Sequence, residues 1–598
     1  MRPGVLLVAI LVGVVLRCAL LAAHEVPHGD VLLDTGVARS LIAGEGFRSG
    51  LQRGTALVRG EGPLPPQDLA DQHPPLWPLL GAALGAASGS AFLGLKLASL
   101  LAGLLLLRVT WRLADRLVES VPGHSQHLPA VATTLVALSF LMLEFSADGA
   151  LYGLQALLVL LLAERLAAAR PGVIVPGLLL GAAWLLNHQA AVLLPVPALV
   201  LACGAEPGRR ARGALQGLAS VGVACLVMAP WWWRNAQAFG DPFFSTNAFY
   251  VLDKAGIRPA FSIEGGQPVA RFPDAPLWRV LLGGLRAWLP ANVLYVTLAG
   301  MLLWPGLLGL AASGAPSLLR AAWRGRDRRL LALLACAAAQ LVITLAWPYT
   351  KLRYLVPLTP LVVLLGIRVW AAPPTRGERR LAWVIAAGWA ALLAGTWGDI
   401  AGTAPDPRPA RWILLAAGGP VLLLLPLLLR HTSPRAVGAG LRTTLVTGLL
   451  AVPVLALAAL LPAPHTSYNG CALLPDIFGQ PQDLLEAREA RVLDRARIVA
   501  LQDGARITCG PETLLAFPAP ALLKLPYAGG GFADAPLAAL LDAGRCDHVI
   551  TLTEPPWPIA IAPGQAWLDG RLVVLDTVTL EEDGETVAAA IVSRAAAP

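Results

Sequence analysis

The chain has 598 residues, of which 56% are hydrophobic and only 14% are charged, whereas soluble globular proteins carry roughly 25% charged residues. This composition excludes an ordinary soluble enzyme and indicates a protein that crosses the membrane many times. The formal net charge of +8 does not indicate nucleic-acid binding, because the basic excess lies in short loops between apolar segments. That distribution is typical of membrane proteins that keep their positive loops in the cytoplasm.

Residues 5–23 form the first apolar segment and follow a basic start. They could be a cleaved signal peptide or a retained first span, and the many apolar segments that follow favour a retained span. Arg17 lies near its predicted outer end, from which the side chain could extend outward or face a site. With this one, about 13 spans are expected, the others lying near 90–110, 128–146, 149–167, 172–186, 189–204, 213–231, 291–312, 330–347, 354–371, 381–398, 411–429 and 443–462.

Arginine clusters orient these spans. If the N-terminus is cytoplasmic, the clusters near Arg112, Arg170, Arg210, Arg324, Arg379 and Arg435 all fall in cytoplasmic loops, as the positive-inside rule requires. An odd number of spans then places the C-terminal tail outside, together with the long loops 24–89 and 232–290. The apolar segment 74–89 is short and rich in Gly and Pro, so an interfacial or re-entrant helix is expected there.

Several carboxylates fall in these outer segments. Asp30 and Asp34 are four residues apart and share one face if a helix begins near Asp30. Asp71 follows in the same loop, and Asp148 precedes the fourth predicted span. Each has a plain structural explanation, because Asp commonly begins a helix by accepting hydrogen bonds from its first N–H groups. Their convergence on one face at membrane depth favours a functional site.

Cations lie on the same predicted face. Arg234 and Asn235 end the segment PWWWRN, whose tryptophans fit an interfacial anchor, and Lys351 and Arg353 lie in PYTKLRYLVPLTP. Carboxylates and cations together suit a reaction in which an acid accepts a proton while cations hold a departing phosphate.

Polar residues also interrupt one apolar region at Asn187, His188 and Gln189. This pattern favours a tight outer turn between two spans, and His188 fits a turn residue better than a metal ligand. No CxxC or Cys/His cluster is present in the sequence, which argues against a structural zinc site. Two or three of the outer acids could bind a divalent metal, but no spacing demands one.

Taken in order, these segments resemble the integral-membrane GT-C glycosyltransferases. The closest resemblance is to the group that contains protein O-mannosyltransferases, the lipid A aminoarabinose transferase and related bacterial enzymes. Five motifs within residues 1–370 carry it: Asp30 followed by VARSLIAGEGF, the triplet His73-Pro74-Pro75, ADGALYGLQ with Asp148 and Tyr152, the Pro-Trp…Arg-Asn…Phe-Gly-x-Pro pattern of residues 230–242, and Arg-Tyr-x-x-Pro-x-x-Pro from Arg353.

The chain departs from the family pattern at two places. Many relatives have Glu after the first Asp and an aromatic residue four positions on, where this chain has Val31 and Asp34. Either Asp30 or Asp34 could therefore be the working acid. Some relatives have a Glu-Lys pair before the prolines, where this chain has Gln72 and His73.

The resemblance implies a sugar donor carried on a polyprenyl or dolichyl phosphate and an acceptor that is a lipid, a glycan or a protein. Transfer is expected on the extracytoplasmic side of the inner membrane, with inversion and without a required cofactor. Asp30, or Asp34 in its place, is the expected general base. Arg353 is the first candidate to hold the leaving phosphate, because its planar fork donates two hydrogen bonds at once. The other expected substrate-binding residues are Asp71, His73, Asp148, Arg234, Asn235 and Lys351.

Residues 464–598 differ from the transmembrane domain predicted for residues 1–463. From His465 onward they contain 9 Lys and Arg against 17 Asp and Glu. Strand-like runs (RIVALQ, HVITLT, RLVVLD and VAAAIV) and a helical run (PLAALLDAG) predict a small extracytoplasmic α/β domain. Its three cysteines, Cys471, Cys509 and Cys546, could form one disulfide, and the sequence leaves the pair open.

Two other functions fit parts of the sequence. A transporter or flippase of lipid-linked sugars would also place charges at membrane depth, but usually near the midplane and often with internal repeats. The sequence has no convincing repeat, and its acids lie at one interface. A non-catalytic membrane scaffold would not need Asp30, Asp71, Asp148 and Arg353 together.

Overall fold

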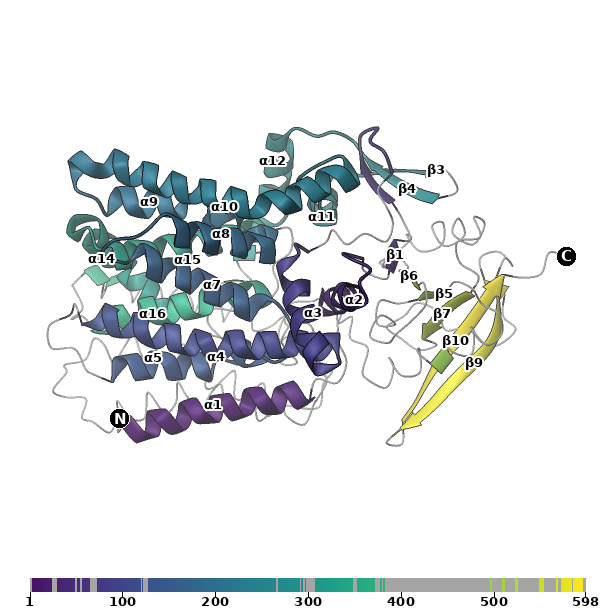
Figure 1. Cartoon of the computed structure of the whole chain (residues 1–598), viewed down its shortest axis with the longest axis horizontal. Coiled ribbons are helices and arrows are strands. Elements are labelled where there is room, and N and C mark those ends of the chain that lie inside the picture. Colours follow the sequence, from purple (N-terminus) through teal and green to yellow (C-terminus); the bar gives the residue numbers. More distant parts are fainter. Residues whose placement is uncertain are drawn as a thin grey trace. The chain divides into compact units, whose positions relative to one another are not determined.

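The structure is a computed structural model of the whole chain (Figure 1). The residues it describes are 3–23, 30–48, 51–53, 56–64, 73–119, 121, 127–264, 267–290, 292–293, 296, 307–347, 352–371, 377–378, 380–381, 495–496, 508–510, 522–524, 548–552, 566–567, 572–582 and 585–594. The chain forms two compact units. The helical unit comprises Met1–Ala23, Lys96–Ala229 and Trp288–Gln482, and the mixed unit comprises His24–Leu95, Pro230–Ala287 and Asp483–Pro598.

Long apolar helices lie alongside one another in the helical unit (Figure 1). Three of the described helical segments are long and apolar enough to cross a bilayer, namely Ala91–Val118, Pro207–Phe239 and Arg328–Ala346, and they coincide with three predicted spans. The helices whose residues lie wholly or mainly in this unit are α1 (Pro3–Ala23), α4 (Ala91–Val118), α5 (Leu128–Ala137), α6 (Phe140–Glu144), α7 (Tyr152–Leu166), α8 (Ile174–Leu186), α9 (Val196–Cys203), α10 (Arg210–Phe239, entering the mixed unit at Pro230), α14 (Leu307–Gly325), α15 (Arg328–Ala346) and α16 (Leu358–Ala371).

Several predicted spans differ from the observed helices. Segment 128–146 divides into α5 and α6, and segment 189–204 divides into the 3₁₀ helix η1 (His188–Leu193) and α9. Helix α14 carries Arg320 and Arg324, which were expected in a loop. The predicted spans 411–429 and 443–462, and all of 381–398 except residue 381, lie outside the described residues, so the number of about 13 spans stays a prediction.

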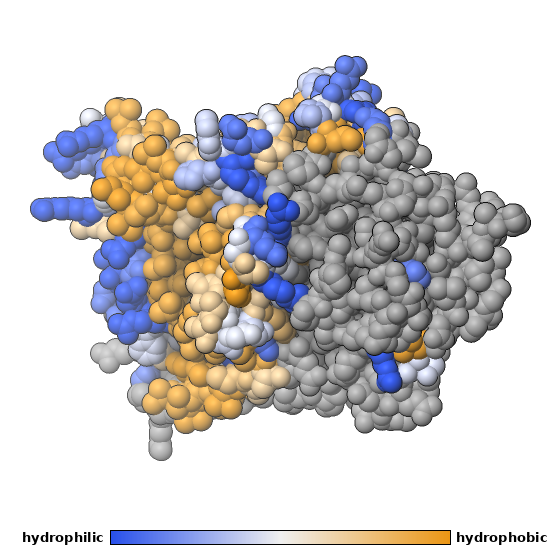
Figure 2. Space-filling view, turned by 45° about the vertical axis from the view of Figure 1, so that its right-hand side comes forward, coloured by the Kyte–Doolittle hydropathy of each residue, from blue (hydrophilic) through white to orange (hydrophobic). Residues whose placement is uncertain are grey.

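The outer surface of the helical unit is strongly hydrophobic. Figure 2 shows hydrophobic residues over much of the left half of the visible face, with hydrophilic residues at the left edge and again toward the centre and top of the view. Large apolar side chains stay exposed on α1 and α10, among them Val15 at 65%, Leu215 at 66% and Leu226 at 75%. Contiguous apolar surface of this kind is rare on soluble monomers. The surface and the apolar helices fit an integral membrane protein.

Helix α7 separates two chemically different ends of the unit. Its last turn carries Glu164, which pairs with Arg112 at 2.9 Å and with Arg116 at 3.1 Å, both on α4. The first residue of α7 is Tyr152, at the motif that was expected on the outer face. The two ends are about 20 Å apart at 1.5 Å of rise per residue. The arginines and the polar motif therefore lie at opposite ends of one helix.

Arg17 takes neither position that the sequence left open. The side chain is fully buried in the helical unit, and its Nη1 donates hydrogen bonds to the carbonyls of Gly13 at 2.9 Å and Ala137 at 2.6 Å. Ala137 ends α5, where backbone carbonyls lack helical partners. The guanidinium thus satisfies the end of α5 at the break before α6.

The mixed unit combines short helices with two sheets. A three-stranded sheet has the order β2-β4-β3 and a seven-stranded sheet the order β1-β6-β5-β7-β10-β9-β8. The helices are α2 (Asp30–Ile42), α3 (Leu76–Ser88), α11 (Thr246–Lys254) and α12 (Leu277–Ala287), and the strands are β1 (Leu51–Arg53), β2 (Ala56–Arg59), β3 (Ala260–Glu264), β4 (Gln267–Phe272), β5 (Thr508–Gly510), β6 (Leu522–Lys524), β7 (His548–Leu552), β8 (Ala566–Trp567), β9 (Leu572–Glu582) and β10 (Glu585–Arg594).

Strand pairing joins segments that are far apart in the sequence. β1, from the first predicted outer loop, pairs in parallel with β6, and β2, from the same loop, pairs in parallel with β4 of the loop 232–290. An open sheet cannot be divided across a lipid bilayer, because its backbone groups would lose their partners. The described strands of both loops and of the tail are therefore expected on one side of the membrane, which is where the predicted topology has them.

Three predicted strands of the tail coincide with β7, β9 and β10. β9 and β10 form an antiparallel pair with a register shift near Ile591. The runs RIVALQ and PLAALLDAG, the predicted boundary after residue 463 and the side chains of the three tail cysteines lie outside the described residues. The separate C-terminal domain and its disulfide stay predictions.

Candidate functional site

Helix α2 carries the paired acids, and local sequence explains its limits. It begins at Asp30, where a carboxylate is favourable because the N-terminus of a helix carries partial positive charge. It ends at Ile42, two residues before Gly44, whose φ of +78° suits a residue without Cβ. The N–H of Glu45 bonds to the carbonyl of Ser40 and that of Gly44 to the carbonyl of Leu41, which is a Schellman motif.

Helix α3 packs against α2 and brings His73 beside it. Pro74 and Pro75 are buried just before α3, and they prevent a helix from extending back to His73. A Cβ on Gly81 of α3 would collide with Leu95 of α4, and one on Gly85 would come within 3.1 Å of Ile42 on α2. Glycines therefore permit the close packing of α3 against α4 and α2.

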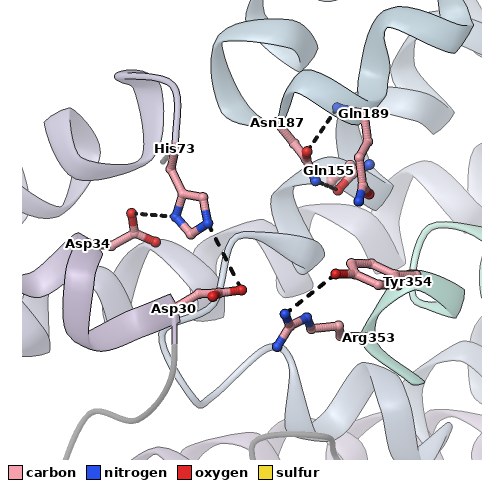
Figure 3. A network of polar contacts seen from close by, with 8 residues as sticks. All are labelled: Asp30, Asp34, His73, Gln155, Asn187, Gln189, Arg353 and Tyr354. Carbon is pink, nitrogen blue, oxygen red and sulfur yellow. Dashed lines mark hydrogen bonds and ion pairs between the residues drawn. The ribbon is translucent and has the colours of Figure 1, made fainter. Parts of the chain in front are cut away.

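His73 lies against the two acids of α2 (Figure 3). Its Nδ1 is 3.0 Å from Oδ1 of Asp34, and its Nε2 is 4.0 Å from Oδ2 of Asp30. Only 3% of the Asp34 side chain is exposed, against 22% for Asp30. Burial raises the pKa of Asp34 above its ordinary value, and the charge and hydrogen bond of His73 oppose that rise. The four-residue spacing does place both acids on one face, as predicted.

Arg234 and Asn235 lie on α10 rather than in a loop after it, because that helix continues to Phe239. Nη1 of Arg234 donates to Oδ1 of Asn235 at 2.9 Å, and the guanidinium lies 4.6 Å from the ring centre of Trp231. Trp231 also contacts Phe47, the last residue of VARSLIAGEGF, at 5.3 Å between ring centres. The motif that begins at Asp30 and the Pro-Trp…Arg-Asn motif thus meet within the mixed unit.

Arg353 is 4% exposed in the helical unit, among aromatic rings. Its guanidinium carbon lies 5.8 Å from the ring centre of Tyr152 and 5.3 Å from that of Tyr354. The two rings are 6.1 Å apart. Cation–π contacts of this kind hold an arginine in place while its planar fork keeps its hydrogen-bonding capacity. The ADGALYGLQ and Arg-Tyr motifs therefore meet as well.

Asp148 shapes the turn that precedes Tyr152. Its Oδ1 accepts a hydrogen bond of 2.8 Å from the N–H of Ala150, and Gly149 has a φ of +89°. Ser99 of α4 donates to the carbonyl of Ala150 at 2.8 Å. The structural explanation of Asp148 was that it caps the following helix. Because α7 begins only at Tyr152, Asp148 does not cap that helix. It closes a turn that is tied to α4.

A polar pair next to this turn was missed by the sequence analysis. Nδ2 of Asn187 donates to Oε1 of Gln155 at 3.1 Å, and Oδ1 of Asn187 accepts from the N–H of Gln189 at 3.0 Å (Figure 3). Gln155 is one turn beyond Tyr152, a helical spacing that could have signalled it. The predicted turn at residues 187–189 is confirmed, since α8 ends at Leu186 and η1 begins at His188.

The expected site residues divide among three clusters. Asp30, Asp34 and His73 come together in the mixed unit, as do Arg234 and Asn235, while Asp148 and Arg353 lie in the helical unit. Asp71 and Lys351 lie outside the described residues. Within the described part of the chain, no group of three or more His, Cys, Asp or Glu residues is arranged to hold a metal ion.

No protein-family model and no curated protein matches the chain, whereas solved structures do. The crystal structure of ArnT from Cupriavidus metallidurans bound to undecaprenyl phosphate has a TM-score of 0.54 at 16% identity and covers 99% of this chain and 98% of that one. Its apo state has a TM-score of 0.55 at 16% identity, with 98% of each chain covered. An Archaeoglobus fulgidus oligosaccharyltransferase with Zn and sulfate covers 91% of this chain and 68% of that one at 11% identity; its TM-score of 0.47 is too low to support an argument.

A likeness that spans both chains almost completely shows the fold. The chain shares the fold of ArnT, and this fold is the one that the sequence resemblance implied.

Proposed function

We propose that this protein transfers a sugar from a polyprenyl-phosphate-linked donor to an acceptor on the extracytoplasmic side of the cell membrane. The observation that carries the proposal is the pair of acids on α2, Asp30 and Asp34. Both lie against His73, which precedes α3, because α3 packs on α2. The fold of a protein that was crystallised with undecaprenyl phosphate supports the choice of donor.

In the proposed reaction Asp30 is the general base. It is more exposed than Asp34, and an ionised carboxylate can take a proton from a hydroxyl or amine within hydrogen-bond reach. The acceptor attacks the anomeric carbon, and the carbon–oxygen bond to the phosphate breaks. The bond's electron pair leaves with the lipid phosphate, and one carboxylate suffices for inversion.

The departing phosphate needs a cation, and Arg353 is our first candidate, with Arg234 next. Both are held by aromatic rings, which lowers the entropic cost of positioning a long side chain. Asp148 supports this role by shaping the turn that presents Tyr152 to Arg353. The mechanism needs no cofactor.

The test is release of free lipid phosphate from a panel of polyprenyl-phosphate sugars, with and without EDTA. We expect Asp30→Asn to reduce release about 100-fold or more, the usual contribution of general base catalysis. Asp115→Asn, an exposed change on α4, should keep the wild-type rate.

Equal rates for the wild type and Asp30→Asn would remove Asp30 from the role of base. No release from any donor, combined with movement of labelled donor across vesicle membranes, would replace the transferase with a flippase.

A further inference from the structure

The arrangement of Asp34, His73 and Asp30 is that of a buried acid orienting an imidazole. Asp34 has 3% of its side chain exposed and lies 3.0 Å from Nδ1. The ring's other nitrogen, Nε2, faces Asp30 at 4.0 Å. In catalytic dyads and triads, a buried carboxylate bonded to Nδ1 fixes the tautomer and leaves Nε2 as a proton acceptor.

We propose that His73 is a positioning residue that receives, through Asp30, the proton taken from the acceptor. The inference rests on the proposed function. Asp30 takes the proton from the attacking hydroxyl or amine as the lipid phosphate leaves. The neutral Nε2 then takes that proton from Asp30, which restores the carboxylate. The resulting imidazolium is paired with the Asp34 carboxylate and finally releases its proton to water.

The distance between Nε2 and Asp30 must shorten for this transfer. At 4.0 Å it exceeds hydrogen-bond length, as is common for catalytic contacts before substrate binds. The two acids share α2, so a small shift of the Asp30 side chain at the first residue of that helix closes the gap. Asp34, near the middle of the buried face, stays fixed.

Two carboxylates lie near the ring of His73 among the residues that the structure describes. The carboxylates of Asp30 and Asp34 face the ring from α2. Helix α3, which packs against α2, carries no ionisable residue between Leu76 and Ser88. Arg39 lies more than one turn beyond Asp34 on α2. Two carboxylates favour the charged imidazole, so its titration should respond when either is neutralised.

An ion pair that only holds the chain before α3 against α2 would predict something else. It would lower stability when broken, yet it would leave the pH dependence of the reaction unchanged. The pH profile therefore separates a proton acceptor from a structural pair.

The experiment measures the rate of lipid-phosphate release against pH for the wild type, His73→Gln and Asp34→Asn, with unfolding temperatures for each. We expect the wild-type rate to fall as pH decreases and the His73 imidazole takes up a proton from solution. In His73→Gln the rate should drop about 10-fold or more, and its acid limb should move toward the carboxylate range near 4.

If His73→Gln does not fold, Asp34→Asn takes its place in the experiment. The amide oxygen of the new side chain can still accept a hydrogen bond from Nδ1–H of His73, while the negative charge of Asp34 is lost. Its acid limb should move below that of the wild type. Histidine-selective NMR in detergent should give a lower His73 pKa in Asp30→Asn than in the wild type. His127→Gln, before α5 in the helical unit, is the matched control and should keep the wild-type profile.

An active wild type whose acid limb stays unmoved in both variants would overturn this inference alone. A His73 titration that ignores Asp30→Asn would do the same. A wild-type protein that releases no lipid phosphate from any donor overturns the proposed function, and this inference with it.

Discussion

Arg329 of α15 donates a hydrogen bond of 2.7 Å from its Nη1 to the backbone carbonyl of Arg116 on α4. Arg328 likewise donates to the carbonyl of Ala169, just after α7, at 3.4 Å. The two bonds join segments of three loops that the positive-inside rule assigned to the cytoplasm, two of which supply the arginines. The helical unit therefore gathers them at one end, and that end is expected to face the cytoplasm.

Single-cysteine labelling tests this orientation. The native cysteines are first removed, and one cysteine is then introduced by Glu206→Cys or by Asp274→Cys. Glu206 lies near the arginine-rich end and is 66% exposed, and Asp274 lies in the second outer loop and is 80% exposed. We expect a membrane-impermeant maleimide to label Asp274→Cys in spheroplasts and Glu206→Cys only after lysis. The reverse order of labelling would contradict the predicted topology.

Replacing Arg353 by lysine should impair the reaction without unfolding the protein. Lysine keeps the charge but loses the planar fork and most of the contact with Tyr152 and Tyr354. We expect lipid-phosphate release to fall about 10-fold, which corresponds to roughly 1.4 kcal/mol, with little change in unfolding temperature. Arg279→Lys, exposed on α12, is the control. Equal rates for both variants would exclude Arg353 from phosphate binding.

Arg17 should contribute to stability rather than to catalysis. Arg17→Met would leave the carbonyl of Ala137 buried without its 2.6 Å donor, and an unsatisfied buried group costs about 1–3 kcal/mol. Thermal unfolding in detergent should show the loss, whereas Arg108→Met, exposed on α4, should change little. Matching unfolding temperatures for the two variants would show that the bond to α5 is dispensable.

The β3–β4 hairpin should weaken in acid. Hydrogen bonds from Arg271 and Ser262 lower the pKa of Glu264 from 4.5 to about 2, the bond from Arg271 being the larger cause. Because the folded pKa lies below the unfolded one, this stabilisation is complete above about pH 4.5 and is lost as pH falls toward 2.

Amide hydrogen exchange in β3 and β4, corrected for intrinsic rates, measures that change. Protection should fall over this pH range in the wild type and stay flat, at a lower level, in Glu264→Gln. Asp274→Asn, whose pair with Arg59 is 57% and 80% exposed, should behave as the wild type. A wild-type protection that does not change below pH 4.5 would contradict the assigned pair.

Patterns along the chain predicted what depends on near neighbours. Apolar content and arginine spacing predicted the membrane class and the end at which the cations gather. The interval between Asp30 and Asp34 predicted their common face, because helical geometry fixes which side chains four residues apart point the same way. The turn at Asn187 followed from polar residues that interrupt an apolar run.

Only tertiary structure decided which of these groups meet. His73 reaches Asp34 across 39 residues because α3 packs on α2, where Gly85 leaves room for Ile42. Arg17 donates a hydrogen bond to the end of α5, 120 residues away, rather than extending to water. β1 pairs with β6, which lies in the C-terminal tail. The sequence by itself determined the membrane class and the local helices and turns, since composition and short-range spacing act within a few residues. Which residues meet across long loops depends on packing and on the need of buried polar groups for hydrogen-bond partners. Neither can be predicted from a single segment.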